Sequence, residues 1–425
     1  MSAPSENSKL SEGSRTRTVA MALAKWAAPA PAMGSAVYRL TQGPREHKHT
    51  YHLFCPWSPD SESLLLARYD RVAPAAEICM MQCATGEISV IGHSRKWESH
   101  SMAFQQWQGN TGRVFYLDAD DAGPIGVTCA SDGSAAKIVR LDDMTSVFCG
   151  PEGRYLYGAT AHAAMFPDDV IAPRHDKGVL RLDVETGERR VILSIADAMR
   201  IAPEVPEQCH MYAKMIIVHR RLPRLMFNFT NTFWDQGLHE PRLRLLLTVG
   251  TDGEEPRYVG PCVHHPNWHP LENRIVANLR DFTGTMRFGL YHGDGSELLE
   301  YVPRTKGSGH PSFSPDGRWL CTDGAGPDGE QIIICDPHTG AARVAAAGKC
   351  FSEGYATQRA IAARAPGETV MAALGRALSG EVRAWTTQSH PAWSRDGSAI
   401  IFNRDVGEGS QLYMIDVRQA LADQS

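Results

Sequence analysis

The sequence lacks several features that would place it in common classes of protein. No apolar run reaches the length of about 18 residues that a membrane-spanning helix needs, which excludes an integral membrane protein. None of the ten cysteines forms a C-x-x-C pair, and most stand in apolar, strand-like segments. This pattern favours buried, reduced thiols over disulfides or zinc knuckles. The net charge of −5 gives no broad basic field, which argues against nonspecific nucleic-acid binding.

Helical periodicity and a nucleophile motif are also missing. A doubly wound α/β fold needs helices of about 10–15 residues between its strands, and the sequence does not contain them. A serine hydrolase with a propeller gate needs a G-x-S-x-G turn in an α/β catalytic domain, and no such turn is present. We therefore exclude both classes and expect an all-β fold.

The sequence does contain a tight turn followed by a β-rich run, and this combination occurs seven times. Proline and Asp-Gly in these turns, as in Ser314-Pro315-Asp316-Gly317, set the backbone dihedrals that a hairpin requires. The seven β-rich runs are 63–69, 113–117, 154–157, 224–229, 274–278, 318–321 and 399–402.

A second hairpin closes most of these units. Its turns are Thr85-Gly86, Thr186-Gly187, Asp252-Gly253, Asp294-Gly295 and Thr339-Gly340. Two hairpins in a unit of about 45 residues make the four-stranded blade of a β-propeller. The sequence therefore predicts a seven-bladed β-propeller that forms one domain over residues 34–420.

Both ends of the chain contribute to this prediction. The last repeat is one strand short, and the run Ala36–Thr41 is expected to supply the missing outer strand, which leaves no open sheet edge. Residues 1–33 are rich in Ser, Ala and Pro, and we expect a disordered or loosely packed arm. Because its apolar stretch is short for a secretory signal, we expect a cytoplasmic protein, with the periplasm as the alternative. Insertions at 161–177 and 349–388 are candidate specificity loops.

Histidines recur near the start of the first apolar segment of the repeats. In a propeller blade the first strand lines the central channel, so side chains at its entrance collect at one mouth. Six blades contribute such residues, and the third contributes none: His52, His100, His210, His265, His310 and His390. One explanation is purely structural, with each histidine hydrogen-bonded inside its own blade. Several imidazoles at one mouth are costly when protonated together, unless a metal or an anion offsets them, so we favour a functional site.

The ligand types suggest which metal such a site would hold. Imidazoles with an amide oxygen and open positions suit Mn²⁺, Fe²⁺, Ni²⁺ or Zn²⁺, whereas Ca²⁺ prefers convergent carboxylates. At most three or four of the histidines are expected to be ligands. We expect a divalent metal, with manganese first and zinc, nickel, iron or calcium as alternatives.

Three of these segments resemble the oligogalacturonate lyases, seven-bladed propeller enzymes that cleave uronate oligosaccharides by β-elimination at a metal site. The resemblance extends from Ala36 to Val417 and rests on short motifs. Val263–Trp268 is similar to that family's His-x-x-Trp segment. Gly309-His310-Pro311-Ser312, followed by Asp316-Gly317 and Thr322-Asp323-Gly324, is similar to a metal-ligand segment, and Ser389–Trp393 to the final ligand segment.

This resemblance implies a role for individual residues. It implies that His265 is the Brønsted base and that His310, His390 and Gln388 are metal ligands. Further catalytic roles fall to Arg244, at the family's substrate-binding arginine, and to His210 and Tyr212 in a further histidine motif. Substrate contacts are expected from His52, His100, His264 and Arg383.

The final ligand segment departs from the family's pattern. The family carries two histidines two residues apart and an upstream glutamine. Here Gln388 stands two residues before His390, and Trp385 takes the upstream place. A histidine from another blade, such as His52 or His210, is therefore expected to complete the metal shell.

Elimination from a uronate fits these residue types. Removal of the C5 proton builds negative charge beside the carboxylate, which a Lewis-acidic metal or Arg244 would stabilise. A neutral His265, with a pKa near the unperturbed value of about 6.5, would then take the proton. We expect an acidic oligosaccharide as partner, no nucleic acid or membrane, and a monomer or homodimer. Two alternatives stay open: a lyase for a glucuronate-containing glycan, and a non-catalytic TolB-like binding propeller.

Overall fold

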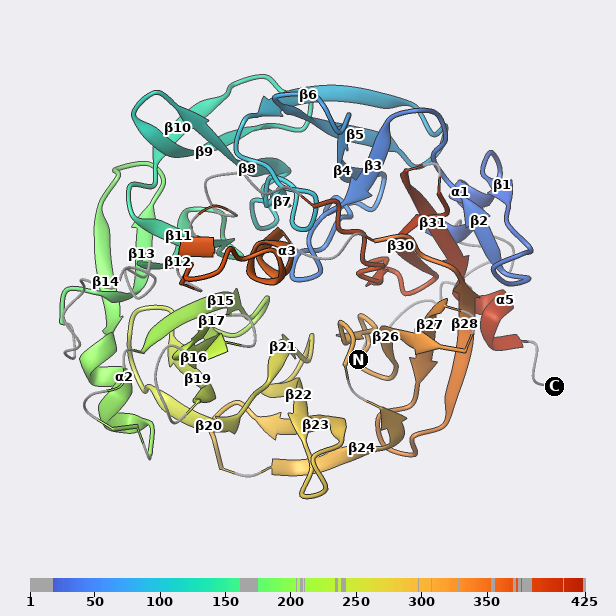
Figure 1. Ribbon diagram of the computed structural model, residues 1–425. Helices are drawn as coiled ribbons and strands as arrows, with labels where there is room; N and C mark the ends of the chain where they lie inside the picture. The colour runs from blue at the N-terminus through green and yellow to red at the C-terminus, as the bar shows by residue number, and fades with distance from the viewer. Residues whose placement is uncertain are drawn as a thin grey trace, which may run out of the picture.

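A ring of seven antiparallel sheets makes up the structure, which is a computed structural model (Figure 1). Six sheets have four strands and one has five. The all-β seven-bladed β-propeller predicted from the repeats is confirmed. The structure describes residues 18–422 except 161–174, 204, 207–208, 210, 234–235, 238–241, 297, 307, 328, 353–355, 370–371, 374–375, 377–383 and 408.

Each of the first six blades runs from an inner strand at the channel to an outer strand at the rim. Blade one contains β3 (Glu46–His49), β4 (Ser63–Tyr69), β5 (Ala76–Gln82) and β6 (Ile88–Ser94). Blade two contains β7 (Gln106–Trp107), β8 (Arg113–Asp120), β9 (Gly123–Ala130) and β10 (Lys137–Arg140). Blade three contains β11 (Met144–Cys149), β12 (Tyr155–Thr160), β13 (Gly178–Asp183) and β14 (Arg189–Ser194).

Blades four to six repeat this order. Blade four contains β15 (Tyr212–Val218), β16 (Arg224–Thr230), β19 (Arg244–Gly250) and β20 (Arg257–Pro261), with a small hairpin of β17 (Thr232–Phe233) and β18 (Gln236–Gly237). Blade five contains β21 (His264–Trp268), β22 (Arg274–Arg280), β23 (Met286–His292) and β24 (Leu298–Lys306). Blade six contains β25 (Ser312–Phe313), β26 (Leu320–Gly326), β27 (Gly329–Cys335) and β28 (Ala342–Gly348).

Blade seven joins the two ends of the chain. Its inner strands are β29 (Ala392–Trp393), β30 (Ala399–Asp405) and β31 (Ser410–Asp416). The outer strands are β2 (Val37–Arg39) and β1 (Ala28–Pro29), and β2 pairs antiparallel with β31, with Val37 opposite Ile415. The predicted closure by an N-terminal strand is confirmed.

Residues 18–33 differ from the expected loose arm. Helix α1 (Val19–Ala24) is capped by Thr18 and buries Val19, Ala20 and Leu23 against blades one and seven. The Val19 amide donates to Asp396 at 2.9 Å. The buried residues are the first, second and fifth of the helix, so they share the face that covers the core. The Ser- and Ala-rich sequence around the helix obscured this apolar pattern. Residues 1–17 lie outside the described part of the chain.

In the repeated turns, a serine hydroxyl forms hydrogen bonds that connect the inner strand of the blade to the start of its second strand. In blade six the Ser314 hydroxyl donates to Asp316 at 2.5 Å and accepts from the Trp319 amide at 2.9 Å. Asx and Ser side chains in such turns mimic backbone hydrogen bonds. The Ser-Pro-Asp turns predicted from the sequence therefore act as structural joints.

Buried tryptophans connect neighbouring blades. The indole N–H of Trp107 in blade two donates to the Pro56 carbonyl at 3.0 Å. Trp268 in blade five donates to Ile217 of blade four, also at 3.0 Å. Trp393 in blade seven repeats the contact with Ser312 of blade six. These hydrogen bonds satisfy the indole inside the core and confirm that the tryptophans belong to the blades.

The remaining helices are short and lie outside the sheets. Within the described residues they include α2 (Ile195–Ile201), α3 (Ala356–Ala362) and α5 (Val417–Ala422), and α3 projects over the centre of the ring in Figure 1. Within the described residues, none of the helices has the length and apolar character that crossing a membrane requires. None of the ten cysteines, all within the described residues, forms a disulfide, and eight are buried.

Candidate metal centre

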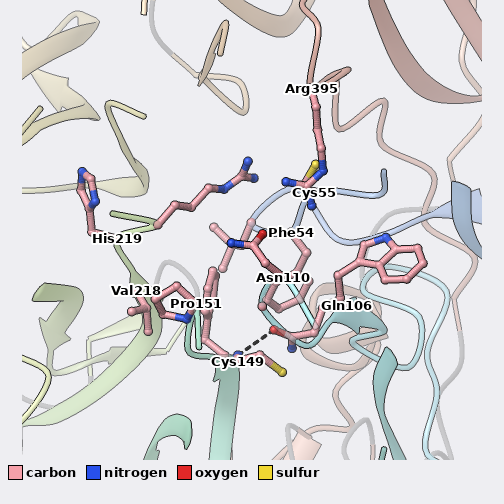
Figure 2. Close-up of a pocket in the computed structure, with 14 residues that line it drawn as sticks. Phe54, Cys55, Gln106, Asn110, Cys149, Pro151, Val218, His219 and Arg395 are labelled. Atoms are coloured by element: carbon pink, nitrogen blue, oxygen red, sulfur yellow. Dashed lines mark hydrogen bonds between the residues drawn. The ribbon is translucent and has the colours of Figure 1, made fainter. Parts of the chain in front are cut away.

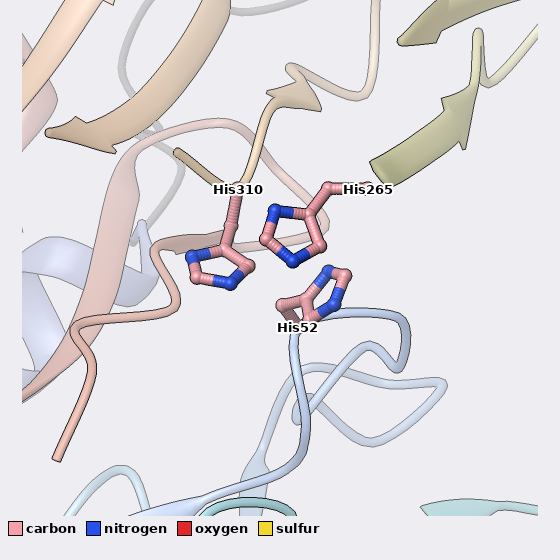
Figure 3. A group of neighbouring side chains, drawn as sticks. All are labelled: His52, His265 and His310. Atoms are coloured by element: carbon pink, nitrogen blue, oxygen red, sulfur yellow. The ribbon is translucent and has the colours of Figure 1, made fainter. Parts of the chain in front are cut away.

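Three imidazoles from separate blades meet at the centre of the ring. His52 comes from blade one, His265 from blade five and His310 from blade six, and their rings point toward one another (Figure 3). One potential ligand atom of each lies within 4.8 Å of the others. The ring centroids are 4.1 Å apart for His265 and His310 and 4.5 Å apart for His52 and His310.

Three further histidines extend this cluster. The His390 ring lies 4.4 Å from that of His310 and 5.3 Å from that of His100, measured between centroids. The His264 ring lies 4.2 Å from that of His265. The expectation that imidazoles far apart in the sequence converge on the channel is confirmed for these residues. We call the six the histidine cluster: His52, His100, His264, His265, His310 and His390.

A left-handed backbone turns two of these side chains toward the axis. His265 has φ = 50° and His390 has φ = 48°. The pairing of β21 with β22 shifts register between His264 and Asn267, which marks a bulge at this point. Ser146 and Met215 have the same conformation at the bulges of blades three and four. The bulge is thus a repeated feature of the inner strand that aims a side chain at the axis.

Two of the three imidazoles have one ring nitrogen committed to a protein acceptor. His310 Nδ1 lies 2.9 Å from both carboxylate oxygens of Asp323, and His265 Nδ1 lies 3.1 Å from the Gly309 carbonyl. Both partners accept hydrogen bonds, so each Nδ1 carries a proton and each Nε2 presents a lone pair.

Two of the nitrogens that would bind a metal lack a protein partner among the described residues. His310 Nε2 and His52 Nε2 are buried and, within the described residues, lack a hydrogen bond. A buried polar atom without a partner is costly, and a metal ion would satisfy both. The carboxylate behind His310 is the outer partner that metal-bound histidines usually have. The donor set therefore fits a transition-metal ion.

Burial keeps four histidines of the cluster neutral. It lowers the pKa of His265, His52 and His390 well below the ordinary value of 6.5, and the neighbouring imidazoles lower it further. Burial also lowers the pKa of His100, to about 3. The expectation that His265 keeps a pKa near 6.5 is wrong, because it is desolvated and surrounded by other imidazoles.

Asp323 belongs to the segment that resembles a metal-ligand motif, and the structure gives it a specific partner in His310. Burial works to raise its pKa, but His310 and the backbone N–H groups of His310 and His390 hold the carboxyl below its ordinary value. Those N–H groups donate to it at 2.7 and 3.2 Å. An aspartate directly after the apolar run Trp319–Thr322 is the signal that was available, because a buried carboxylate requires partners.

The segment that carries Gln388 and His390 is anchored on two sides. His390 Nε2 lies 3.1 Å from Gln388 Oε1, and Asn403 of β30 donates to the Gln388 carbonyl at 3.3 Å. On the other side, the buried ammonium of Lys48 donates to the Ser99 and Thr386 carbonyls at 2.5 Å each. The insertion therefore ends in a fixed segment beside the cluster.

The remaining predicted site residues either lie in blade four or fall outside the residues that the structure describes. Tyr212 of β15 and Arg244 of β19 lie on either side of β16 in blade four, because each pairs with Thr230 from one side. Burial raises the pKa of the Tyr212 hydroxyl, with Arg244 opposing. His210 and Arg383 lie outside the described residues, as do positions 161–174 of the first insertion.

Comparisons with known proteins address the fold. No family model and no curated protein sequence matches this chain. The chain is similar to an oligogalacturonate lyase from Vibrio parahaemolyticus, with a TM-score of 0.62 and 14% identity over 90% of this chain and 93% of that one. An oligogalacturonate lyase in complex with manganese gives 0.63 and 14% over 92% and 95%.

The propeller domain of the Trilobed protease from Pyrococcus furiosus is also similar, with a TM-score of 0.51 and 10% identity over 87% of this chain and 96% of that one. At such identities the likeness shows a shared fold and no shared activity. In architecture, the chain is a seven-bladed β-propeller whose fold is similar to that of these lyases and of the β-propeller domain of this protease.

Proposed function

We propose that the protein is a metal-dependent lyase that cleaves uronate-containing oligosaccharides by β-elimination. The observation that carries the proposal is the set of three convergent imidazoles with buried, unpartnered Nε2 atoms at His52 and His310. The manganese bound to a lyase of similar fold supports a divalent cation, with manganese as the first candidate. An acidic oligosaccharide of the oligogalacturonate type is the proposed substrate.

His52, His265 and His310 would hold the metal. Bound there, it would act as a Lewis acid toward the uronate carboxylate, lowering the free energy of the dianion that forms as C5 loses its proton. Asp323 accepts from His310 Nδ1 and so keeps its Nε2 available. The Gly309 carbonyl does the same for His265.

His390 is the proposed proton acceptor. Its Nε2 donates to Gln388, which leaves Nδ1 unprotonated, buried and without a partner within the described residues. Its low pKa keeps it neutral before the substrate binds, and an anionic substrate beside it raises its basicity. Arg244 is proposed to bind a carboxylate of the substrate from blade four.

This assignment changes the role that the family resemblance implied for His265. In the alternative, His265 is the base and the metal lies between His310, His390 and Gln388. The two arrangements differ in one measurable respect, because a ligand and a base respond differently to removal. Loss of a ligand reduces bound metal, whereas loss of the base reduces the rate at full metal occupancy.

The test combines metal analysis with an assay of elimination. The full-length protein would be stripped with chelator, reloaded with Mn²⁺ and mixed with oligogalacturonates and glucuronate-containing oligosaccharides, and the ultraviolet absorbance of the unsaturated product would be followed. We expect His265→Ala to lose metal and activity, and His390→Ala to keep metal and lose activity. His93→Ala, at an exposed histidine on β6, serves as the control.

The outcomes separate the alternatives. The reverse pattern, with metal kept in His265→Ala and lost in His390→Ala, would establish His265 as the base. Product from glucuronate substrates alone would identify a lyase for a different uronate. A protein that binds no divalent metal and releases no unsaturated product would refute the proposal and favour a binding propeller.

A further inference from the structure

The central channel has a second mouth, at the opposite end from the histidine cluster. His310 and His390 precede their inner strands, whereas the turns that follow the inner strands lie at the other end of the ring. A cavity of about 320 Å³ opens there and is lined by residues of all seven blades, among them the turn residues Asn110, Arg220 and Arg395. His52 also lines it, so the cavity extends from these turns toward the cluster.

The charge in this cavity is of one sign. Three arginines line it, and none of the described lining residues is acidic: Arg220, Arg221 and Arg395. A smaller cavity of about 80 Å³ shares Arg220 and Arg395 with it, and Arg395 is seen there beside Cys55 (Figure 2). Guanidinium groups that converge on one cavity repel one another unless an anion lies between them.

Two nitrogens of the Arg395 guanidinium are hydrogen-bonded to the protein, and the third is available to a ligand. Its Nε and Nη2 donate to the Trp57 carbonyl at 3.2 and 3.1 Å, and within the described residues Nη1 has no partner. Burial lowers the pKa of Arg395, and the charge of Arg220 lowers it further. The nearby Asp60 opposes this shift, but its carboxylate is bonded to the Ser58 hydroxyl and the Glu62 amide.

We propose that the second mouth is a binding site for the oxyanion group, carboxylate or phosphate, of a small anionic solute. Arg395 supplies a fixed guanidinium, and Arg220 and Arg221 supply charge from the facing turn. Arginine suits both groups because its planar fork matches two oxygens at once. Asn110 adds an amide donor at the rim. The site uses no metal and none of the residues proposed to remove the proton.

Isothermal titration calorimetry of the full-length protein tests this site. Inorganic phosphate and D-galacturonate would be titrated separately with chelator present, so that no metal at the histidines binds the anion, and neutral galactose would be the ligand control. We expect saturable binding of at least one anion and none of galactose. Arg220→Gln should weaken it by about tenfold or more, the usual effect of removing a charged hydrogen-bond partner.

The control variants separate this site from others. Arg190→Gln removes the same charge from an exposed position on β14 and should leave the affinity unchanged. His310→Ala should also leave it unchanged, which distinguishes this site from the metal centre. Arg395→Gln also loses the Trp57 contact, so Arg220→Gln decides the matter.

Each outcome has one meaning. Binding of phosphate alone identifies a phosphorylated solute, and binding of galacturonate alone identifies a sugar acid. No binding of either anion, or equal affinity in Arg220→Gln and the unaltered protein, overturns the site. Loss of binding in His310→Ala would assign the anion to the histidine cluster and overturn it too.

Discussion

Replacing Asp323 by asparagine should weaken metal binding while leaving all three proposed ligands in place. The carboxylate accepts from His310 Nδ1 at 2.9 Å and from two backbone N–H groups. Asparagine retains one acceptor oxygen, but its amide N–H₂ must face a donor. The His310 ring would then rotate or change tautomer, so that its Nε2 no longer faces His52 and His265 as a lone pair.

The expected effect is a fall in metal affinity of about 10–100-fold, the usual result of losing such an outer partner. That range corresponds to about 1.4–2.7 kcal/mol of binding free energy. Competition with a coloured chelator would measure the affinity for Mn²⁺ in both proteins. Asp132→Asn, at an exposed turn of blade two, is the matched control. Unchanged affinity in a folded Asp323→Asn protein would refute the idea that this carboxylate orients His310.

Two further predictions concern stability. Burial lowers the pKa of His47 and His49 to about 4 in the folded protein, against 6.5 in the unfolded chain. Between these two values the unfolded chain binds more protons than the folded protein. The free energy of unfolding should therefore fall as the pH drops from 6.5 to about 4, by ~3 kcal/mol for each residue. Urea titrations of the metal-free protein would measure this, and a midpoint independent of pH over that window would contradict it. Val37→Asp places an unpaired charge on β2, where Val37 is 1% exposed opposite Ile415, and should cost on the order of 4 kcal/mol. Val72→Asp, at a position 86% exposed, should cost little, and equal midpoints for the two variants would argue against closure of the ring by β2.

The fold could be predicted because its signals are local. Turns such as Ser314–Gly317 and the hairpin turn at Thr339-Gly340 lie within a few residues of the strands they connect, so their spacing in the sequence reports the blades directly. The role of Ala36–Thr41 followed from counting strands. The helix at Val19–Ala24 was missed, because a segment of six residues gives too little periodicity to distinguish it from a loose arm.

The site could be predicted only in outline. Equivalent positions in the repeats indicated that the histidines meet, since equivalent strands lie around one axis. Which nitrogens face one another depends on χ angles and on the left-handed backbone of His265. A glycine in the sequence suggests a positive φ, whereas a histidine gives no such indication. The partnership of Asp323 with His310 was likewise hidden, because it depends on contact between β26 and the segment before β25.

The origin of the three imidazoles in blades one, five and six has a consequence for the maturation of the protein. His52 is synthesised before His265 and His310, which lie more than 200 residues further along the chain. A cation that needs all three donors cannot guide the early steps of folding during translation. Loading would be a late event, and an incomplete chain would have little means of retaining the ion.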